Sequence, residues 1–355
     1  MTRSGRLPAL PLTALVVALT AVLAAALAAP ALGAAPAADP RPTAVVALGD
    51  SVAAGDGAGD YEPGTRGEGG NWCHRSRHAY VHRTGLAAES VNLACSGAES
   101  ADVAFGAGGH HTEGSQAARL VEVAGRFRVT TVVVQLGAND DAALTATGIA
   151  CIRAFLDPTV PPCRQTLAPL LDGRMAATAT KVEAAVGDVR AAMRRAGYRD
   201  GGYELVVLSY ASPVTERMVG VQGVLGCPYS RPDAGWGRTV LFPGLSAALA
   251  GAAERSGARF VDMARATEGY EACSRAAFSE EWQRRITVSA EAFAYGGLDA
   301  AGYHLAQESF HPSAAGHAQF GQCLGEFVRS ALPAAACVPA AGRLQVQAAV
   351  DSPAA

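Results

Sequence analysis

Short apolar runs separated by longer amphipathic stretches are the main pattern of this chain. The apolar runs are rich in Val, Leu and Ala, and several end at Gly, Asn or Asp. Runs of this kind are typical of parallel strands that are buried on both faces. The pattern therefore predicts strands over residues 43–48, 90–94, 130–136, 203–210 and 259–262.

Helical periodicity is clearest between the third and fourth of these strands. Apolar residues in the stretch 168–196 recur mostly at steps of three and four, and Gly197 is a helix stop. A last helix is expected to start near Ser313 and to run to Leu332. Strands that alternate with helices predict an α/β fold, a three-layer α/β/α sandwich with a central, mainly parallel sheet.

The two ends of the chain are predicted to lie outside this fold. Arg3 and Arg6 precede a long run of Ala, Leu, Val, Pro and Thr, so residues 1–38 are typical of a secretory signal peptide and its cleavage region. A transmembrane anchor is the alternative, but small residues and Pro follow the run, and no later segment is typical of a membrane span. Residues 39–337 form the expected domain, and residues 338–355 are expected to be a disordered tail.

Composition supports an exported globular protein. Half of the residues are hydrophobic and the net charge is −3, which excludes the basic footprint of a nucleic-acid-binding protein. The eight cysteines include no CxxC pair, which argues against zinc. In an oxidising compartment they are expected to form disulfides. Of 105 possible pairings, our hypothesis is the sequential one: Cys73–Cys95, Cys151–Cys163, Cys227–Cys273 and Cys323–Cys337.

Polar motifs directly follow two of the predicted strands. Gly49-Asp50-Ser51 comes after the first strand, and Gly137-Ala138-Asn139-Asp140 comes after the third. Ligands of parallel sheets bind at the carboxyl ends of the strands, so both motifs are expected on the same edge. Ser51 is a candidate nucleophile if a base takes its proton, although a serine in this position is also a common helix N-cap.

His311 is the candidate base. Histidine side chains titrate near neutral pH, which suits proton transfer, and Pro312 favours a loop just before the last helix. Asn139 is able to donate a side-chain N–H to a developing oxyanion, or else it is a turn residue. Gly97, after the second strand, lets a backbone N–H approach a bound carbonyl closely, and Asp140 is expected to brace its loop.

This arrangement resembles the SGNH, or GDSL, hydrolases, and in particular the secreted lipases, esterases and phospholipases of actinobacteria. The resemblance runs from about Thr43 to Leu332. It implies that Ser51 is the nucleophile and His311 the base, and that the Ser51 N–H, the Gly97 N–H and the Asn139 side chain form the oxyanion hole. No GxSxG elbow of an ordinary α/β-hydrolase is present.

The sequence departs from the family pattern at two positions. Val52 stands where the family usually has Leu, which is a conservative packing change. Glu308 stands three residues before His311, where the family often has Asp. Either the Glu308 carboxylate orients His311, or a nearby backbone carbonyl does so; both alternatives are open at this stage.

The resemblance implies a secreted serine ester hydrolase of the esterase, lipase or phospholipase type. A carbohydrate O-acetyl esterase on the same scaffold is the alternative, and Trp72, Trp236, Tyr229 and Phe242 are the aromatic residues in predicted loops that bear on it. A non-catalytic binding protein is disfavoured because all four motif residues are present. We expect a monomer that acts on a lipid or small-molecule ester without a metal or organic cofactor, a stable membrane span or a nucleic-acid partner.

Two further features are predicted to be surface features. The segment Gly55–Gly70 is glycine-rich and carries Asp56, Asp60, Glu62 and Glu68, but it lacks the spacing of an EF-hand calcium loop. His110 and His111 do not form a HExxH zinc motif. We therefore interpret both as exposed loops, with a ligand cradle or calcium site in Gly55–Gly70 as the alternative.

Overall fold

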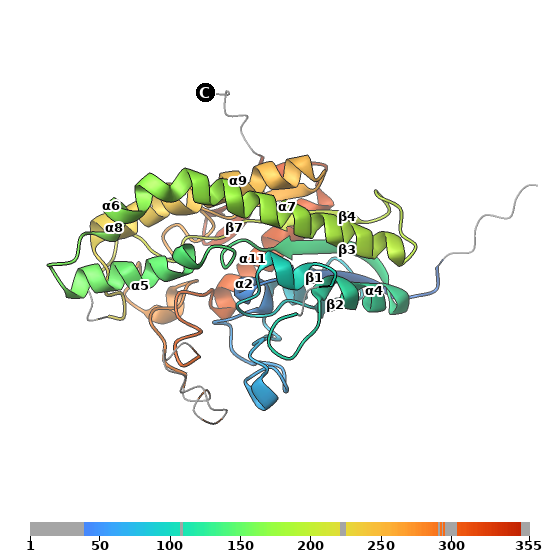
Figure 1. The fold of residues 1–355 in the computed structure, drawn as a ribbon, viewed down its shortest axis with the longest axis horizontal. Coiled ribbons are helices and arrows are strands. Elements are labelled where there is room, and N and C mark those ends of the chain that lie inside the picture. The colour runs from blue at the N-terminus through green and yellow to red at the C-terminus, as the bar shows by residue number, and fades with distance from the viewer. Residues whose placement is uncertain are drawn as a thin grey trace, which may run out of the picture. The chain divides into compact units, whose positions relative to one another are not determined.

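The computed structural model describes residues 39–106, 109–220, 225–289, 292, 294 and 304–348, and Figure 1 shows its ribbon. The expected signal peptide, residues 1–38, lies outside the described residues. From Arg41 onward the described residues belong to one compact unit. No helix among them is long and apolar enough to cross a membrane.

One seven-stranded sheet forms the centre of this unit, with the strand order β2-β1-β3-β4-β5-β6-β7. Strands β1 to β6 pair in parallel, and β7 pairs antiparallel with β6. All the strands expected from the apolar runs are present. The strands are β1 (Thr43–Gly49), β2 (Glu89–Asn92), β3 (Arg128–Gln135), β4 (Glu204–Leu208), β5 (Arg259–Asp262), β6 (Ala334–Ala340) and β7 (Arg343–Ala348).

The last two strands correct an expectation. The segment 338–355 was expected to be a disordered tail, but β7 lies within it and pairs with β6 from Ala335↔Ala348 to Ala340↔Arg343. The physical reason is burial at alternate positions: Leu344 is fully buried, and Val346 packs against the same core. Residues 349–355 lie outside the described part of the chain.

Two hydrophobic cores cover opposite faces of the sheet, as the alternation of side chains along a strand requires. On β1, Val46 and Leu48 contribute to the first core, while Val45 and Ala47 contribute to the second. The first core contains residues of α4 (Gln116–Arg126), α7 (Leu171–Arg195) and α9 (Phe242–Arg255). The second contains residues of α11 (Ala314–Arg329) and of η2 (Tyr80–Arg83). The chain therefore forms the expected α/β/α layers (Figure 1).

The remaining described helices lie in the connections, and all but α5 are short. They are α2 (Ser51–Ala54), η1 (Glu68–Gly70), α3 (Ser100–Val103), α5 (Ala142–Leu156), α6 (Cys163–Leu167), η3 (Ala168–Leu170), α8 (Arg231–Trp236), the π-helix η4 (Gly237–Leu241) and η5 (Phe278–Glu280).

Both long helices that the sequence predicted are present, with shifted ends. The stretch 168–196 begins as the 3₁₀ helix η3 and continues as α7, and Gly197 follows it in the left-handed conformation that favours glycine. Helix α11 begins after Ser313, whose hydroxyl accepts a hydrogen bond from the Gly316 N–H. It ends at Arg329, three residues before the expected Leu332.

All four disulfides of the sequential hypothesis are present, and the described residues include no free cysteine. Cys73–Cys95 anchors the loop that follows β2, and Cys151–Cys163 joins α5 to α6. Cys227–Cys273 joins the segments that follow β4 and β5. Cys323–Cys337 fastens α11 to β6. Each bridge restricts the unfolded chain, and bridges of this loop size typically stabilise a protein by about 3 kcal/mol.

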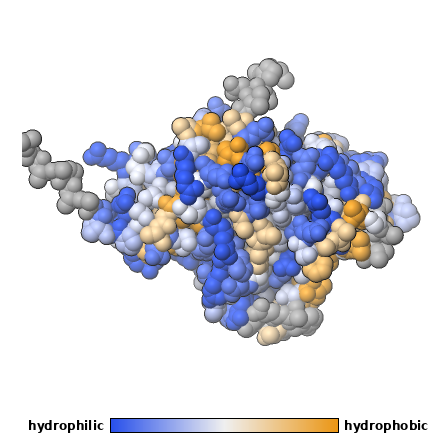
Figure 2. All heavy atoms as spheres, turned by 180° about the vertical axis from the view of Figure 1, so that it is seen from behind, coloured by the Kyte–Doolittle hydropathy of each residue, from blue (hydrophilic) through white to orange (hydrophobic). Residues whose placement is uncertain are grey.

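Some hydrophobic side chains lie at the molecular surface. The face opposite to that of Figure 1 is mostly hydrophilic, with smaller hydrophobic areas between the polar side chains (Figure 2). The exposed large hydrophobic residues that are described include Ile149 and Leu156 on α5 and Val240 on η4.

Candidate active site

Ser51 lies in the turn between β1 and α2, at the carboxyl edge of the sheet. Gly49 has a φ of 145°, and a Cβ there would lie 2.0 Å from the Gln135 carbonyl oxygen, so only glycine fits. The Asp50 N–H donates to that same carbonyl at 3.1 Å. Asp50, and not Ser51, caps α2 by accepting from the Val52 N–H at 3.1 Å. The serine hydroxyl is thus not used as the cap.

His311 meets Ser51 at this edge. Its Nε2 lies 2.7 Å from the Ser51 Oγ, although the two residues are 260 positions apart in the chain. Its Nδ1 lies 3.2 Å from the Ser309 carbonyl oxygen. Because a carbonyl only accepts hydrogen bonds, the proton of the neutral ring is assigned to Nδ1. Nε2 then accepts the hydrogen bond of the serine hydroxyl.

The loop that carries His311 is held by backbone hydrogen bonds to a neighbouring segment. The Arg284 N–H donates to the His311 carbonyl at 2.8 Å, and the Phe310 N–H donates to the Arg284 carbonyl at 3.1 Å. Gln283 and Pro312 form an isolated β-bridge beside them. These contacts fix His311 in a loop just before α11, which is the position that Pro312 predicted.

Glu308 does not reach His311. The structure records no ion pair between the Glu308 carboxylate and the imidazole in this described region, and the Glu308 side chain faces Tyr61. Burial raises the pKa of the Tyr61 hydroxyl far above its usual range, and the charges of Asp56 and Glu308 add to that rise. Of the two alternatives from the sequence, the geometry favours the backbone carbonyl, and Ser309 supplies it.

Gly97 and Asn139 lie on loops that meet beside Ser51. The Cys95 N–H donates to the Gly49 carbonyl at 3.1 Å, which joins the loop after β2 to the serine turn. The Asn139 Nδ2 donates to the Ala98 carbonyl at 3.2 Å, next to Gly97. The sequence placed the segments after β1 and β3 on one edge, and the structure brings the segment after β2 to the same place.

Asp140 braces these loops, as the sequence predicted. Its carboxylate accepts from the Ser100 N–H at 3.1 Å and from the Ser100 hydroxyl at 2.8 Å. Burial raises the pKa of Asp140 above its usual range, although the hydrogen bonds from Ser100 act in the opposite direction. The aspartate thus fixes α3, just after Gly97, to the loop that carries Asn139.

Sequence reasoning missed Tyr210, which follows β4. Its hydroxyl donates to the fully buried carboxylate of Asp50 and accepts from the Ala138 N–H at 3.3 Å. Burial raises the pKa of Asp50 to about 7, because the hydrogen bonds from Tyr210 and Val52 offset only part of the cost of removing the charge from water. No local pattern marks Tyr210, since its partners Asp50 and Ala138 lie in the segments that follow β1 and β3.

The segment Gly55–Gly70 was predicted to be an exposed surface loop, but its residue Asp56 is buried. Its carboxylate is fully buried, lies 2.6 Å from the His74 Nδ1 and accepts hydrogen bonds from the Ser96 hydroxyl and from the Gln307 side chain. Among the described residues, no group of three or more His, Cys, Asp or Glu side chains is arranged to hold a metal ion. Through the hydrogen bond from the Ser96 hydroxyl, Asp56 fixes Ser96, the residue before Gly97.

His110 is closer to the site than the sequence predicted. His111 is exposed, as expected, but His110 is half-buried, and a Cβ on Gly97 would lie 2.8 Å from its Nε2. The His110 Nδ1 lies 3.3 Å from the Asp102 carboxylate. Gly97 itself has a φ of 82°, a conformation that side chains rarely adopt. The imidazole of His110 thus borders the glycine that faces the serine turn.

Comparison with known proteins identifies the family of the chain. The model of the GDSL-like lipase/acylhydrolase family matches residues 47–319, which is most of the chain. The chain belongs to this family, and it is therefore a carboxylic ester hydrolase. No curated protein matched the sequence.

Solved structures with a similar fold are distant in sequence. An extracellular lipase from Streptomyces rimosus is 21% identical, with a TM-score of 0.45, over 78% of this chain and 94% of that one. A phospholipase A1 from Streptomyces albidoflavus is 21% identical, with a TM-score of 0.47, over 81% of this chain and 99% of that one. A carbohydrate acetylesterase from Sinorhizobium meliloti is 12% identical, with a TM-score of 0.35, over 81% of this chain and 98% of that one.

Proposed function

We propose that this protein is an exported serine ester hydrolase in which Ser51 is the nucleophile and His311 the general base. The observation that carries the proposal is the 2.7 Å contact between the His311 Nε2 and the Ser51 Oγ. At this distance the imidazole takes the hydroxyl proton as the oxygen attacks. The Ser309 carbonyl, 3.2 Å from Nδ1, holds the ring in the tautomer that leaves Nε2 free to accept.

The reaction proceeds in two steps. Ser51 Oγ bonds to the ester carbonyl carbon, His311 receives the hydroxyl proton, and the developing oxyanion accepts hydrogen bonds from the Ser51 N–H, the Gly97 N–H and the Asn139 Nδ2. The bond to the alcohol oxygen breaks as His311 returns its proton to that oxygen. A water molecule then attacks the acyl-enzyme while His311 takes a proton from it. The bond from the acyl carbon to Ser51 Oγ breaks, His311 returns the proton to Oγ, and the carboxylic acid leaves.

Export is supported by two observations. Four disulfides restrain the described residues, and disulfides persist in oxidising compartments. The segment that precedes the fold has the composition of a secretory signal. Detection of the mature protein in culture medium, with its N-terminus between Gly33 and Asp39, tests this part of the proposal.

A simple or lipid ester fits better than an acetylated carbohydrate. Sugar-binding sites use exposed aromatic faces, but Trp72 and Tyr229 are buried. Trp236 and Phe242, which the sequence placed in loops, lie on α8 and α9 and line an apolar pocket. The aromatic residues that suggested the carbohydrate alternative thus favour a hydrocarbon ligand.

The test is labelling with a fluorophosphonate and hydrolysis of p-nitrophenyl acetate. The wild-type protein is expected to be labelled at Ser51 and to turn over the ester. Ser51→Ala is expected to lose both activities while it keeps the wild-type circular dichroism spectrum and melting temperature. Hydrolysis that survives in the folded Ser51→Ala protein would reject the mechanism.

A further inference from the structure

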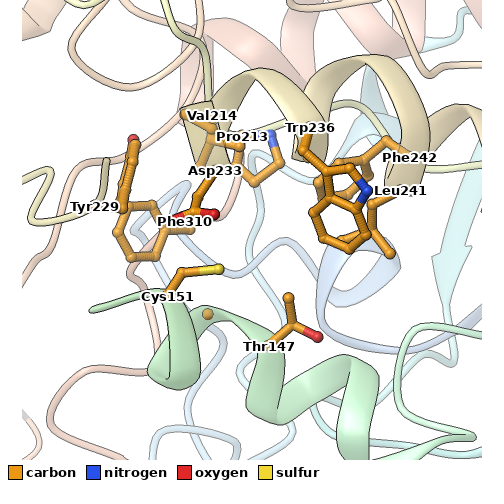
Figure 3. A pocket seen from close by; sticks show the side chains of 13 residues that line it. Thr147, Cys151, Pro213, Val214, Tyr229, Asp233, Trp236, Leu241, Phe242 and Phe310 are labelled. Atoms are coloured by element: carbon orange, nitrogen blue, oxygen red, sulfur yellow. The ribbon is translucent and has the colours of Figure 1, made fainter. Parts of the chain in front are cut away.

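An apolar pocket lies between α5 and α8 on the carboxyl side of the sheet. Its volume is about 150 Å³. Figure 3 shows the side chains of these two helices, of the start of α9 and of the loop after β4 arranged around it. The residues that decide its character are Thr147, Val214, Ala234, Trp236, Phe242 and Phe310.

The lining of this pocket favours an uncharged ligand. Asp233 is the one charged residue among its described lining residues. The Asp233 carboxylate is buried and already paired: it accepts from the Arg164 Nη1 at 2.9 Å and from the Ser230 hydroxyl at 2.7 Å. A second charge in the pocket would have to be buried without a partner, which is costly.

The pocket is bounded by the two segments that carry the catalytic groups. Helix α5, which contributes Thr147 and Cys151, begins at Ala142, just after the loop with Asn139. On the other side, Phe310 lines the pocket and directly precedes His311. A ligand held here thus contacts α5, which follows the loop with Asn139, and it contacts Phe310, the neighbour of His311.

Phe310 is held toward this pocket at a conformational cost. Its φ is 60°, in the left-handed region that bulky side chains rarely adopt. The ring packs on Tyr229, with 5.8 Å between the ring centroids. The same backbone turn that sets the Phe310 ring against the pocket leads into His311, so pocket shape and base position are coupled through one residue.

From these observations we propose that the pocket binds the acyl chain of the ester, and that it takes an unbranched hydrocarbon chain of about six carbons. The inference rests on the proposed function, because it assigns the acyl side of the same reaction. An apolar cavity of about 150 Å³ holds a molecule the size of benzene, which has six carbons. The acyl group stays bonded to Ser51 between the two steps, whereas the alcohol leaves after the first. A pocket that holds the acyl chain therefore holds it during both steps.

Chain-length selectivity is the first measurement. For p-nitrophenyl esters, kcat/KM is expected to rise about fourfold per added methylene from acetyl toward hexanoyl, because each buried methylene contributes a constant free energy. The rise is expected to stop beyond hexanoyl. A flat profile from acetyl to hexanoyl would overturn the proposal, as would a rise that follows the alcohol chain in a series of alkyl acetates.

Variants of the lining provide the second measurement. Ala234→Leu fills the pocket and is expected to lower the ratio of hexanoyl to acetyl kcat/KM at least tenfold. Trp236→Ala widens it and is expected to move the preferred chain to octanoyl or longer. Val240→Ala, in the exposed part of the adjacent η4, is the matched control and is expected to keep the wild-type ratio. If both lining variants change kcat/KM by the same factor for all esters, the proposal is overturned, and the serine mechanism remains intact.

A binding measurement separates the pocket from catalysis. In the Ser51→Ala protein, hexanamide is expected to change the fluorescence of Trp236 on titration, and the change is expected to disappear in Ser51→Ala/Trp236→Phe. Affinity is expected to fall at least tenfold with Ala234→Leu. Hexanamide binding that Ala234→Leu leaves unchanged would overturn the pocket assignment, whatever the ester assays show. Ester hydrolysis that persists in the Ser51→Ala protein, with this binding preserved, would instead refute the proposed function and leave the pocket assignment intact.

Discussion

The Tyr210 hydroxyl donates a hydrogen bond to the carboxylate of Asp50, the residue immediately before Ser51. The same hydroxyl accepts from the Ala138 N–H, one residue before Asn139. A single side chain from the end of β4 thus joins the serine turn after β1 to the oxyanion loop after β3. We interpret Tyr210 as a positioning residue, because its buried side chain reaches both loops through Asp50 and the Ala138 N–H.

Tyr210→Phe tests this role. The variant keeps the ring but removes the hydrogen bond from the Tyr210 hydroxyl to Asp50 and the one that this hydroxyl accepts from the Ala138 N–H, so we expect a loss of about 1–3 kcal/mol in the free energy of unfolding. We also expect kcat to fall about tenfold with little change in KM, because positioning acts on the transition state. Tyr203→Phe, at the opposite end of β4, is the control. A similar loss of kcat in both variants would refute a specific role for Tyr210.

Asp50→Asn tests the pH dependence of stability. The folded pKa of Asp50 is raised by burial from 3.8 to about 7. Between these values the folded protein keeps a proton that the unfolded chain has released, so the free energy of unfolding decreases as the pH rises from about 4 to 7. Asn does not ionise, and the variant is expected to show a shallower decrease in urea unfolding. Parallel curves for wild type and variant would contradict this.

Glu271→Gln is expected to act on the same pH window independently. Burial raises the pKa of Glu271 to about 7, and its Oε1 lacks a hydrogen-bond partner in the described structure. The sign is therefore the same as for Asp50: stability is lost as the pH rises through about 7. We expect the variant to be more stable than wild type at pH 8, and to have the same kcat. Lower stability at pH 8 would show that the ionised carboxylate is satisfied in the folded state.

Glu308→Gln separates the two ways of orienting His311. Because the Ser309 carbonyl faces Nδ1, we expect kcat/KM of the variant to stay within about threefold of wild type, with an unchanged pH profile. His311→Ala is the matched reference and is expected to lose activity by about 10⁴-fold or more. A loss in Glu308→Gln that approaches this reference would assign the orienting role to the carboxylate.

Asn139→Ala measures the side-chain part of the oxyanion hole. Removal of one such donor typically lowers kcat by about 10²–10³-fold, and we expect a loss of this size with p-nitrophenyl acetate. Asn139→Asp keeps the shape but replaces the donor by an acceptor, and it is expected to lose at least as much. Recovery of activity in Asn139→Asp would show that the amide N–H does not contact the oxyanion.

Much of the framework was predictable because it depends on local patterns. Near-continuous apolar runs marked β1 to β5, and strand ends followed by polar motifs placed Ser51 and Asn139 on one edge. Strands β6 and β7 were missed for a physical reason. Ala334–Ala340 contains small residues and a proline with little β-propensity. Arg343–Ala348 does alternate apolar and polar residues, which is a strand signal, but it is a short strand of 6 residues in a stretch of mostly small and polar residues that was interpreted as a tail. Their stability comes from pairing and from Leu344, not from local preference.

The supporting shell of the site was not predictable from the sequence. Tyr210 meets Asp50 across 160 positions, and Gln307 meets Asp56 across 251. Such contacts depend on the order of strands in the sheet, which no short motif encodes. Asp56 even carried a misleading signal, since an aspartate among glycines is usually a solvated turn residue. The role of the Ser309 carbonyl was also not predictable, because every residue has a backbone carbonyl and no sequence pattern distinguishes this one.

The separation of 260 positions between Ser51 and His311 has a consequence for synthesis of the protein. The base is among the last parts of the fold to be made, and α11, which follows it, is fastened to β6 by Cys323–Cys337. A truncated or partly folded chain carries the serine without its proton acceptor. On the proposed mechanism, the appearance of esterase activity therefore reports completion of nearly the whole fold.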